Sequence, residues 1–187
     1  MRSRTALVPT LAVFYGTVQP DSARRELAAL PGGTRVPADM SAWFDQHAGF
    51  ATPASRANAA ADLRLDQALT RRAFELGGLV EAGTDAHAGD YSLPGNGQHR
   101  ELTLLVRASL TPVAALHAAT GEAGKIKGRP DLDTLHPSSI ADVLIRAGDP
   151  AINIRAARNV HSVLQAGRVL PIYSLLRQVT ATANTGQ

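Results

Sequence analysis

The spacing of apolar and polar positions in the first half of the chain predicts alternating strands and helices. Residues 6–14 and 79–82 are short apolar runs typical of buried strands, with Pro9 at a weakly hydrogen-bonded position. Residues 31–56 are rich in proline and glycine and predict a loop. Residues 56–76 then place their apolar side chains mostly on one helical stripe. The predicted order is strand, long connection, helix, strand.

The second half of the chain changes from helical patterns to short β patterns. Before that change, in the long connection between the two strands of the first half, residues 21–30 predict a helix capped by Asp21 and Ser22. Residues 99–107 predict an amphipathic helix, and Thr111 followed by Pro112 begins another, because threonine caps a helix and proline fits its first turn. Past Gly128, three short strands are expected at residues 140–145, 160–164 and 168–170.

Composition and charge exclude several classes of protein. The 187 residues are 44% hydrophobic and carry a net charge of +3, with no run of basic residues and few aromatic side chains, so we expect no nucleic-acid partner. We expect no membrane association either, because no stretch approaches the roughly 18 apolar residues of a membrane span. Cysteine is absent, so a metal must be held by histidine, aspartate or glutamate.

The basic start of the chain superficially resembles a signal peptide. Pro9 interrupts the apolar segment that follows, and no small-x-small cleavage site comes soon after it. We therefore expect a cytoplasmic protein, although a segment upstream of Met1 would be the place for a signal peptide.

The strongest candidate for chemistry is the segment Gly-Thr-Asp-Ala-His-Ala-Gly at residues 83–89. It places Asp85 where a buried strand opens into a loop, and (β/α) barrels carry their active sites at such strand ends. A turn aspartate is the alternative interpretation. His87, two residues further, either forms a two-ligand site with Asp85 or lies in the loop near the substrate entrance, and we favour the loop.

Several fragments in a fixed order resemble the amidohydrolase superfamily, in the branch of imidazolonepropionase-like and prolidase-like metal-dependent hydrolases. The resemblance runs from about residue 8 to residue 170. It is carried by these fragments: Gly83-Thr84-Asp85-Ala86, His99-Arg100-Glu101-Leu102, Leu110-Thr111-Pro112, Ala141-Asp142-Val143-Leu144, Gly148-Asp149-Pro150 and Gly167-Arg168-Val169.

The resemblance implies a fold and a division of the chain. The expected fold class is α/β, the C-terminal part of a (β/α)8 TIM-type barrel with short strands of the small amidohydrolase β-sandwich. Residues 8–14 would be the seventh barrel strand and residues 79–83 the eighth. Residues 1–128 would form the partial barrel, residues 129–175 the β-sandwich strands, and residues 176–187 a tail.

The resemblance also implies a metal-dependent hydrolase of amide or cyclic amide C–N bonds, acting on small amides or dipeptide-like substrates. Asp85 falls on the family's metal-binding and catalytic aspartate, and the metal would be one or two divalent ions, usually zinc. His87, His99 and Glu101 are candidates for contacting substrate.

The family's other metal ligands have no counterpart in this sequence. These are a His-x-His pair on the first strand, a lysine bridge on the fourth and single histidines on the fifth and sixth. We therefore expect a C-terminal piece of an amidohydrolase, with activity that requires the missing strands. The alternatives are a catalytically inactive remnant that binds an N-terminal half through an exposed barrel edge, and self-association of several copies.

Overall fold

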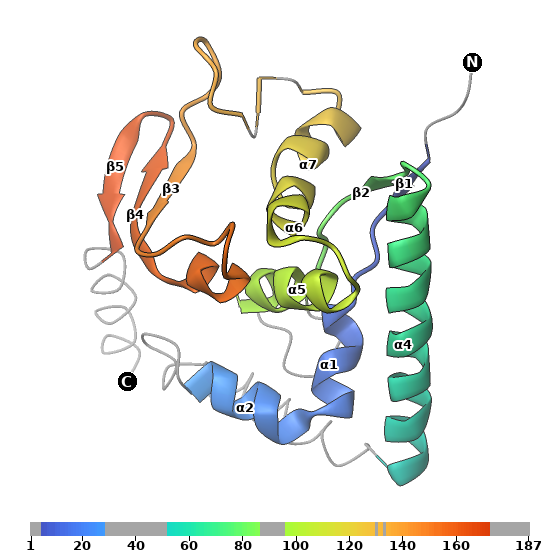
Figure 1. Ribbon diagram of the computed structural model, residues 1–187. Coiled ribbons are helices and arrows are strands. Elements are labelled where there is room, and N and C mark those ends of the chain that lie inside the picture. Colours follow the sequence, from blue (N-terminus) through green and yellow to red (C-terminus); the bar gives the residue numbers. More distant parts are fainter. Residues whose placement is uncertain (1–4, 29–51, 87–95, 130, 133, 173–187) are drawn as a thin grey trace.

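The computed structural model describes residues 5–28, 52–86, 96–129, 131–132 and 134–172 (Figure 1). Predictions for residues 31–51, for His87 and for the tail lie outside these residues. The helices and strands in chain order are β1 (Ala6–Leu7), α1 (Ala12–Val18), α2 (Pro20–Ala28), α4 (Pro53–Glu75), β2 (Leu79–Val80), α5 (Asn96–Arg107), α6 (Pro112–Ala118), α7 (Gly121–Ile126), β3 (Val143–Arg146), the 3-10 helix η2 (Ile154–Arg158), β4 (Val160–Gln165) and β5 (Arg168–Pro171).

Strands β1 and β2 form a parallel pair, although residues 8–78 lie between them in the sequence. Ala6 lies opposite Leu79 and Leu7 opposite Val80. The N–H of Glu81 extends the ladder by donating a 2.9 Å hydrogen bond to the carbonyl of Leu7. A parallel connection needs a long crossover, and helices α1, α2 and α4 provide it. The pairing places the C-terminal ends of both strands at the same edge.

The strand predicted for residues 6–14 ends at Leu7 in the structure. The assignment of residues 8–14 as the seventh barrel strand, which the resemblance implies, is therefore wrong. Thr10 has a φ of 48°, a left-handed conformation that turns the chain away from the strand direction. Helix α1 then begins at Ala12, although Val13 and Phe14 both favour strands. Leu11 and Ala12 are fully buried, so tertiary contacts at the start of α1 outweigh local preference.

The predicted helices are present, with small differences at their ends. Helix α4 begins at Pro53 rather than residue 56, because the Thr52 side chain caps it by accepting a 3.1 Å hydrogen bond from the Ser55 N–H. Thr111 caps α6 in the same way, accepting from the Ala114 N–H at 3.1 Å. Among the described residues, no helix combines the length and apolar content that a membrane span requires.

The C-terminal part forms a three-stranded antiparallel sheet in the order β3–β4–β5. This confirms the three strands that the sequence predicts there. The hairpin between β4 and β5 turns at Ala166 and Gly167, both with positive φ. The carboxylate of Asp142 holds the turn by accepting a 2.7 Å hydrogen bond from the Ala166 N–H. In Figure 1 this sheet lies at the opposite side of the molecule from helix α4.

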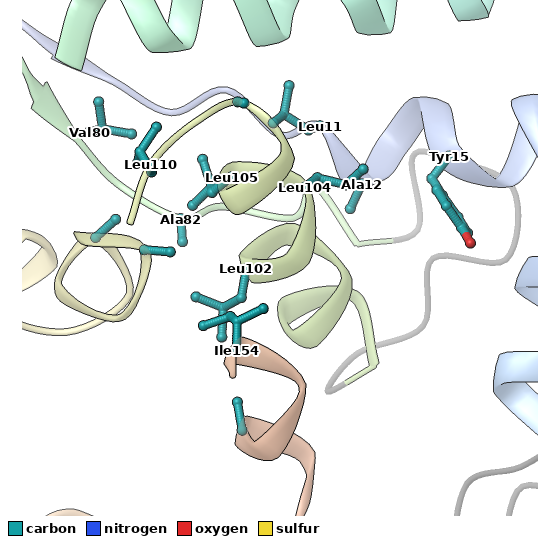
Figure 2. Close-up of a cluster of buried hydrophobic side chains, with 14 residues drawn as sticks. Leu11, Ala12, Tyr15, Val80, Ala82, Leu102, Leu104, Leu105, Leu110 and Ile154 are labelled. Carbon is teal, nitrogen blue, oxygen red and sulfur yellow. The ribbon is translucent and has the colours of Figure 1, made fainter. Parts of the chain in front are cut away.

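The hydrophobic core centres on helix α5. Leu102, Leu104 and Leu105 of this helix are almost fully buried, and Figure 2 shows Leu102 beside Ile154 of η2. The same cluster joins the strand pair to α1 and α6. Its members are Leu11, Ala12, Tyr15, Val80, Ala82, Leu102, Leu104, Leu105, Ala108, Leu110, Ala115, Ala118, Ile154 and Ala157. The core therefore fixes the strand ends, α1 and α5 relative to one another.

Candidate site at the ends of the two parallel strands

Asp85 lies in the loop that follows β2, at the edge where both parallel strands end. It is exposed and has a φ of 44°. Aspartate and asparagine adopt this left-handed conformation more readily than other residues with a Cβ atom. The location that the sequence predicts for Asp85, in a loop directly after a buried strand, is therefore confirmed.

Three contacts position the chain just before Asp85. The N–H of Ala82 donates a 3.0 Å hydrogen bond to the carbonyl of Ala118 at the end of α6. The carbonyl of Ala82 accepts from Nε2 of Gln98 at 3.3 Å, which ties the first turn of α5 to the strand end. At Gly83 a Cβ atom would lie only 2.3 Å from Cγ1 of Val8, so any side chain at this position would force Val8 to shift.

The described residues alone do not complete a metal site. Among them, no group of three or more histidine, aspartate or glutamate side chains gathers at one place. Catalytic zinc normally takes three protein ligands and keeps one position open, so Asp85 could supply one ligand of such a site. Asp85 lines none of three cavities that the described residues form, which lie beside α2, beside α6 and beside β3.

Glu101 is fully buried, and its carboxylate lies at the start of helix α1. Its Oε2 accepts a 2.7 Å hydrogen bond from the N–H of Ala12. Burial raises the pKa of Glu101 from 4.5 to about 7, while the backbone N–H groups of Ala12 and Leu11 act in the opposite direction. The Glu101 carboxylate therefore lies at the N-terminus of α1, where the helix dipole favours a negative charge, although Glu101 itself belongs to helix α5.

This contact gives Glu101 a structural role. It satisfies one of the N–H groups that the first turn of a helix leaves without a partner. A contact between Glu101 and substrate stays a prediction.

His99 is half-buried in the first turns of α5. Its pKa is lowered by burial first, and then by the positive charges of Arg158 and Arg146. Its Nδ1 is buried and has no hydrogen-bond partner among the described residues. A contact between His99 and substrate also stays a prediction.

A second group of charged residues was not predicted from the sequence. Arg100 of α5 is 2% exposed and packs over the ring of Tyr15, 4.7 Å from its centroid. Glu26 of α2 accepts a 3.0 Å hydrogen bond from the Tyr15 hydroxyl and lies 3.3 Å from Nη2 of Arg158. Nη1 of Arg158 also donates to Oδ1 of Asn96 at 3.2 Å. These residues lie far apart in the sequence, so no local motif brings them together.

Comparisons with known proteins find solved structures with a similar fold. The chain is similar to the crystal structure of a Xaa-Pro dipeptidase with bound methionine in the active site, with a TM-score of 0.63 and 21% identity over 89% of this chain. It is similar to a bottromycin amidohydrolase, with a TM-score of 0.67 and 23% identity over 93% of this chain. A third similar structure is another amidohydrolase, with a TM-score of 0.56 and 20% identity over 89% of this chain.

The match covers only part of each of these proteins. This chain spans 34% of the dipeptidase, 34% of the third similar structure and 38% of the bottromycin amidohydrolase. No protein-family model matches the sequence, and a search of curated proteins by sequence gives no match. At these identities the likeness concerns the fold. The chain has a mixed helix and strand fold with small sheets that is similar to the C-terminal part of amidohydrolase domains, and a complete barrel is not shown.

Proposed function

We propose that this chain contributes Asp85 to the active site of a metal-dependent amidohydrolase that cleaves C–N bonds. The observation that carries the proposal is the position of Asp85. It follows β2 at the edge where two parallel strands end, within a fold similar to two amidohydrolases and a dipeptidase. Strand ends of this kind hold the catalytic residues of (β/α) barrels.

The chemistry assigned to Asp85 is proton transfer beside a divalent ion. Such an ion, usually zinc in hydrolases of this type, supplies a nucleophile at neutral pH by lowering the pKa of a water molecule. The Asp85 carboxylate is exposed, so it can ligate the ion and accept a proton. The same carboxylate can pass that proton to the departing nitrogen.

Completion of the site is part of the proposal. A full barrel has eight strands, whereas the described residues provide one parallel pair. The remaining ligands would come from residues outside the described ones, in this chain or in the rest of a complete barrel. A small amide or dipeptide-like compound is the proposed substrate class, in keeping with the dipeptidase among the similar structures.

One observation favours the alternative function, an inactive fragment that binds another chain. Within the described residues, β1 and β2 pair only with each other, so both outer edges are open. Helix α4 also exposes Leu65, Leu69 and Phe74, each by more than two fifths of its surface. An open strand edge beside apolar surface promotes pairing with another chain. This alternative predicts neither bound metal nor hydrolysis.

The test uses the protein expressed from the complete reading frame that contains residues 1–187. It compares Asp85→Asn with wild type in metal content and in hydrolysis of a panel of dipeptides. Asparagine tolerates the left-handed conformation, so the variant removes the charge while keeping the loop. We expect loss of bound metal and a drop in activity of about 100- to 10,000-fold, the range for a removed acid-base group. Asp62→Asn, an exposed aspartate on α4, is the matched control. Equal metal content and activity in all three proteins would overturn the proposal.

A further inference from the structure

A cavity of about 300 Å³ lies between α1, α2, α5 and η2, and its walls are strongly basic. Four arginines line it, two from α5 and two from η2, together with Tyr15 and Glu26: Arg100, Arg107, Arg155 and Arg158. Among the described residues, four arginines and one glutamate therefore line the same cavity. Neither Asp85 nor any residue near it in sequence takes part.

Glu26 balances only part of this positive charge. Its Oε2 lies 3.5 Å from Nε of Arg100 and 3.3 Å from Nη2 of Arg158. Its Oε1 accepts the hydrogen bond from the Tyr15 hydroxyl. Both carboxylate oxygens are thus engaged at the inner side of the cavity. The guanidinium groups of Arg107 and Arg155 remain as additional positive charge on the exposed side.

The inner wall is built into the core rather than placed on the surface. Arg100 is 2% exposed and is held between Glu26 and the ring of Tyr15. Burial lowers the pKa of Arg100, whereas the negative charge of Glu26 acts in the opposite direction. Glu26 is the acidic residue among those that line the cavity, so the four arginines leave net positive charge there, and an anion in the cavity would balance it.

We propose that this cavity binds a small oxyanion, a molecule that carries a phosphate or carboxylate group. The planar guanidinium fork matches both groups because it donates two parallel hydrogen bonds to paired oxygens. The volume lies at the lower end of the range for small-molecule sites, which runs from about 300 to 1,000 Å³. This inference is independent of the hydrolase proposal, since it uses no property of Asp85.

The experiment is calorimetric titration of the 187-residue chain with inorganic phosphate and, separately, with succinate, at constant ionic strength set by sodium chloride. The test variant is Arg107→Ala/Arg155→Ala, because both side chains are exposed and their removal leaves the buried Arg100 contacts in place. Arg64→Ala, an exposed arginine on α4 outside the cavity, is the matched control. Circular dichroism verifies that all three proteins are folded.

We expect one saturable site for at least one of the two anions, with unchanged affinity in Arg64→Ala. The double variant should bind at least about tenfold more weakly, because each arginine contributes a charge-assisted hydrogen bond. Binding of phosphate alone assigns a phosphate ligand, and binding of succinate assigns a carboxylate. The proposal is overturned if the folded wild type binds neither anion, or if the double variant binds as tightly as wild type.

Discussion

Replacing Glu101 by glutamine should change how the stability of this protein depends on pH. Burial raises the pKa of Glu101 from 4.5 to about 7 in the folded state. The folded state therefore binds a proton between these two pH values that the unfolded state has released. Stability from this proton is fully present below pH 4.5 and is lost as the pH rises through 7. The whole change corresponds to about 3.5 kcal/mol, at roughly 1.4 kcal/mol per pKa unit.

Glutamine has nearly the same shape but no charge to desolvate. Its amide oxygen can still accept the hydrogen bond that the Ala12 N–H donates to Glu101. We expect the two proteins to differ little at pH 5. At pH 8, Glu101→Gln should have a free energy of unfolding roughly 2–3 kcal/mol higher than that of wild type, because only wild type carries a buried charge.

The assay is urea unfolding followed by circular dichroism at several values between pH 5 and 8. His99 also titrates differently in the folded state, because its pKa is lowered, but its contribution is common to both proteins and cancels in the difference. Glu75→Gln is the control: this exposed carboxylate has its pKa lowered by Arg71, so it titrates below the pH range. Parallel pH profiles for wild type and Glu101→Gln would refute the burial argument.

Two further predictions concern the segments that position the strand ends. Thr111→Ala removes the side-chain cap of α6 and should lower the free energy of unfolding by about 1 kcal/mol, whereas Thr111→Ser should retain most of it; equal urea midpoints for all three proteins would contradict this. Gly83→Ala places a Cβ atom 2.3 Å from Cγ1 of Val8 and should cost about 1–3 kcal/mol. Adding Val8→Ala should restore part of that loss, and an additive double variant would show that the clash does not form.

The parts of the fold that the sequence predicts are those governed by local chemistry. Thr111 and Pro112 specify the start of α6, and the apolar runs near the C-terminus specify three strands. The end of β1 was missed because it depends on distant contacts. Val13 and Phe14 favour a strand locally, but Glu101, 89 positions from Ala12, accepts a hydrogen bond from the Ala12 N–H and stabilises the start of a helix.

The same difference separates Asp85, which local sequence locates, from the arginine-lined cavity, which distant contacts form. Asp85 could be located from the sequence because a strand pattern and a glycine-bounded loop stand next to it. The arginine-lined cavity could not be found, because Tyr15, Glu26, Arg100 and Arg158 meet only through packing of α1, α2, α5 and η2. Arg100 follows His99 in a helix whose sequence pattern indicates only that it is amphipathic. Its burial depends on partners more than 70 positions away.

The most direct test of the proposed function uses the protein expressed from the complete reading frame that contains residues 1–187. Bound zinc, manganese and iron are measured by mass spectrometry, and hydrolysis of dipeptides and cyclic amides is measured on the same samples of wild type and Asp85→Asn. We predict bound metal and hydrolysis in wild type and loss of both in the folded variant. A wild-type protein that is folded yet holds no metal and cleaves no amide would contradict the account, as would a variant that retains both properties.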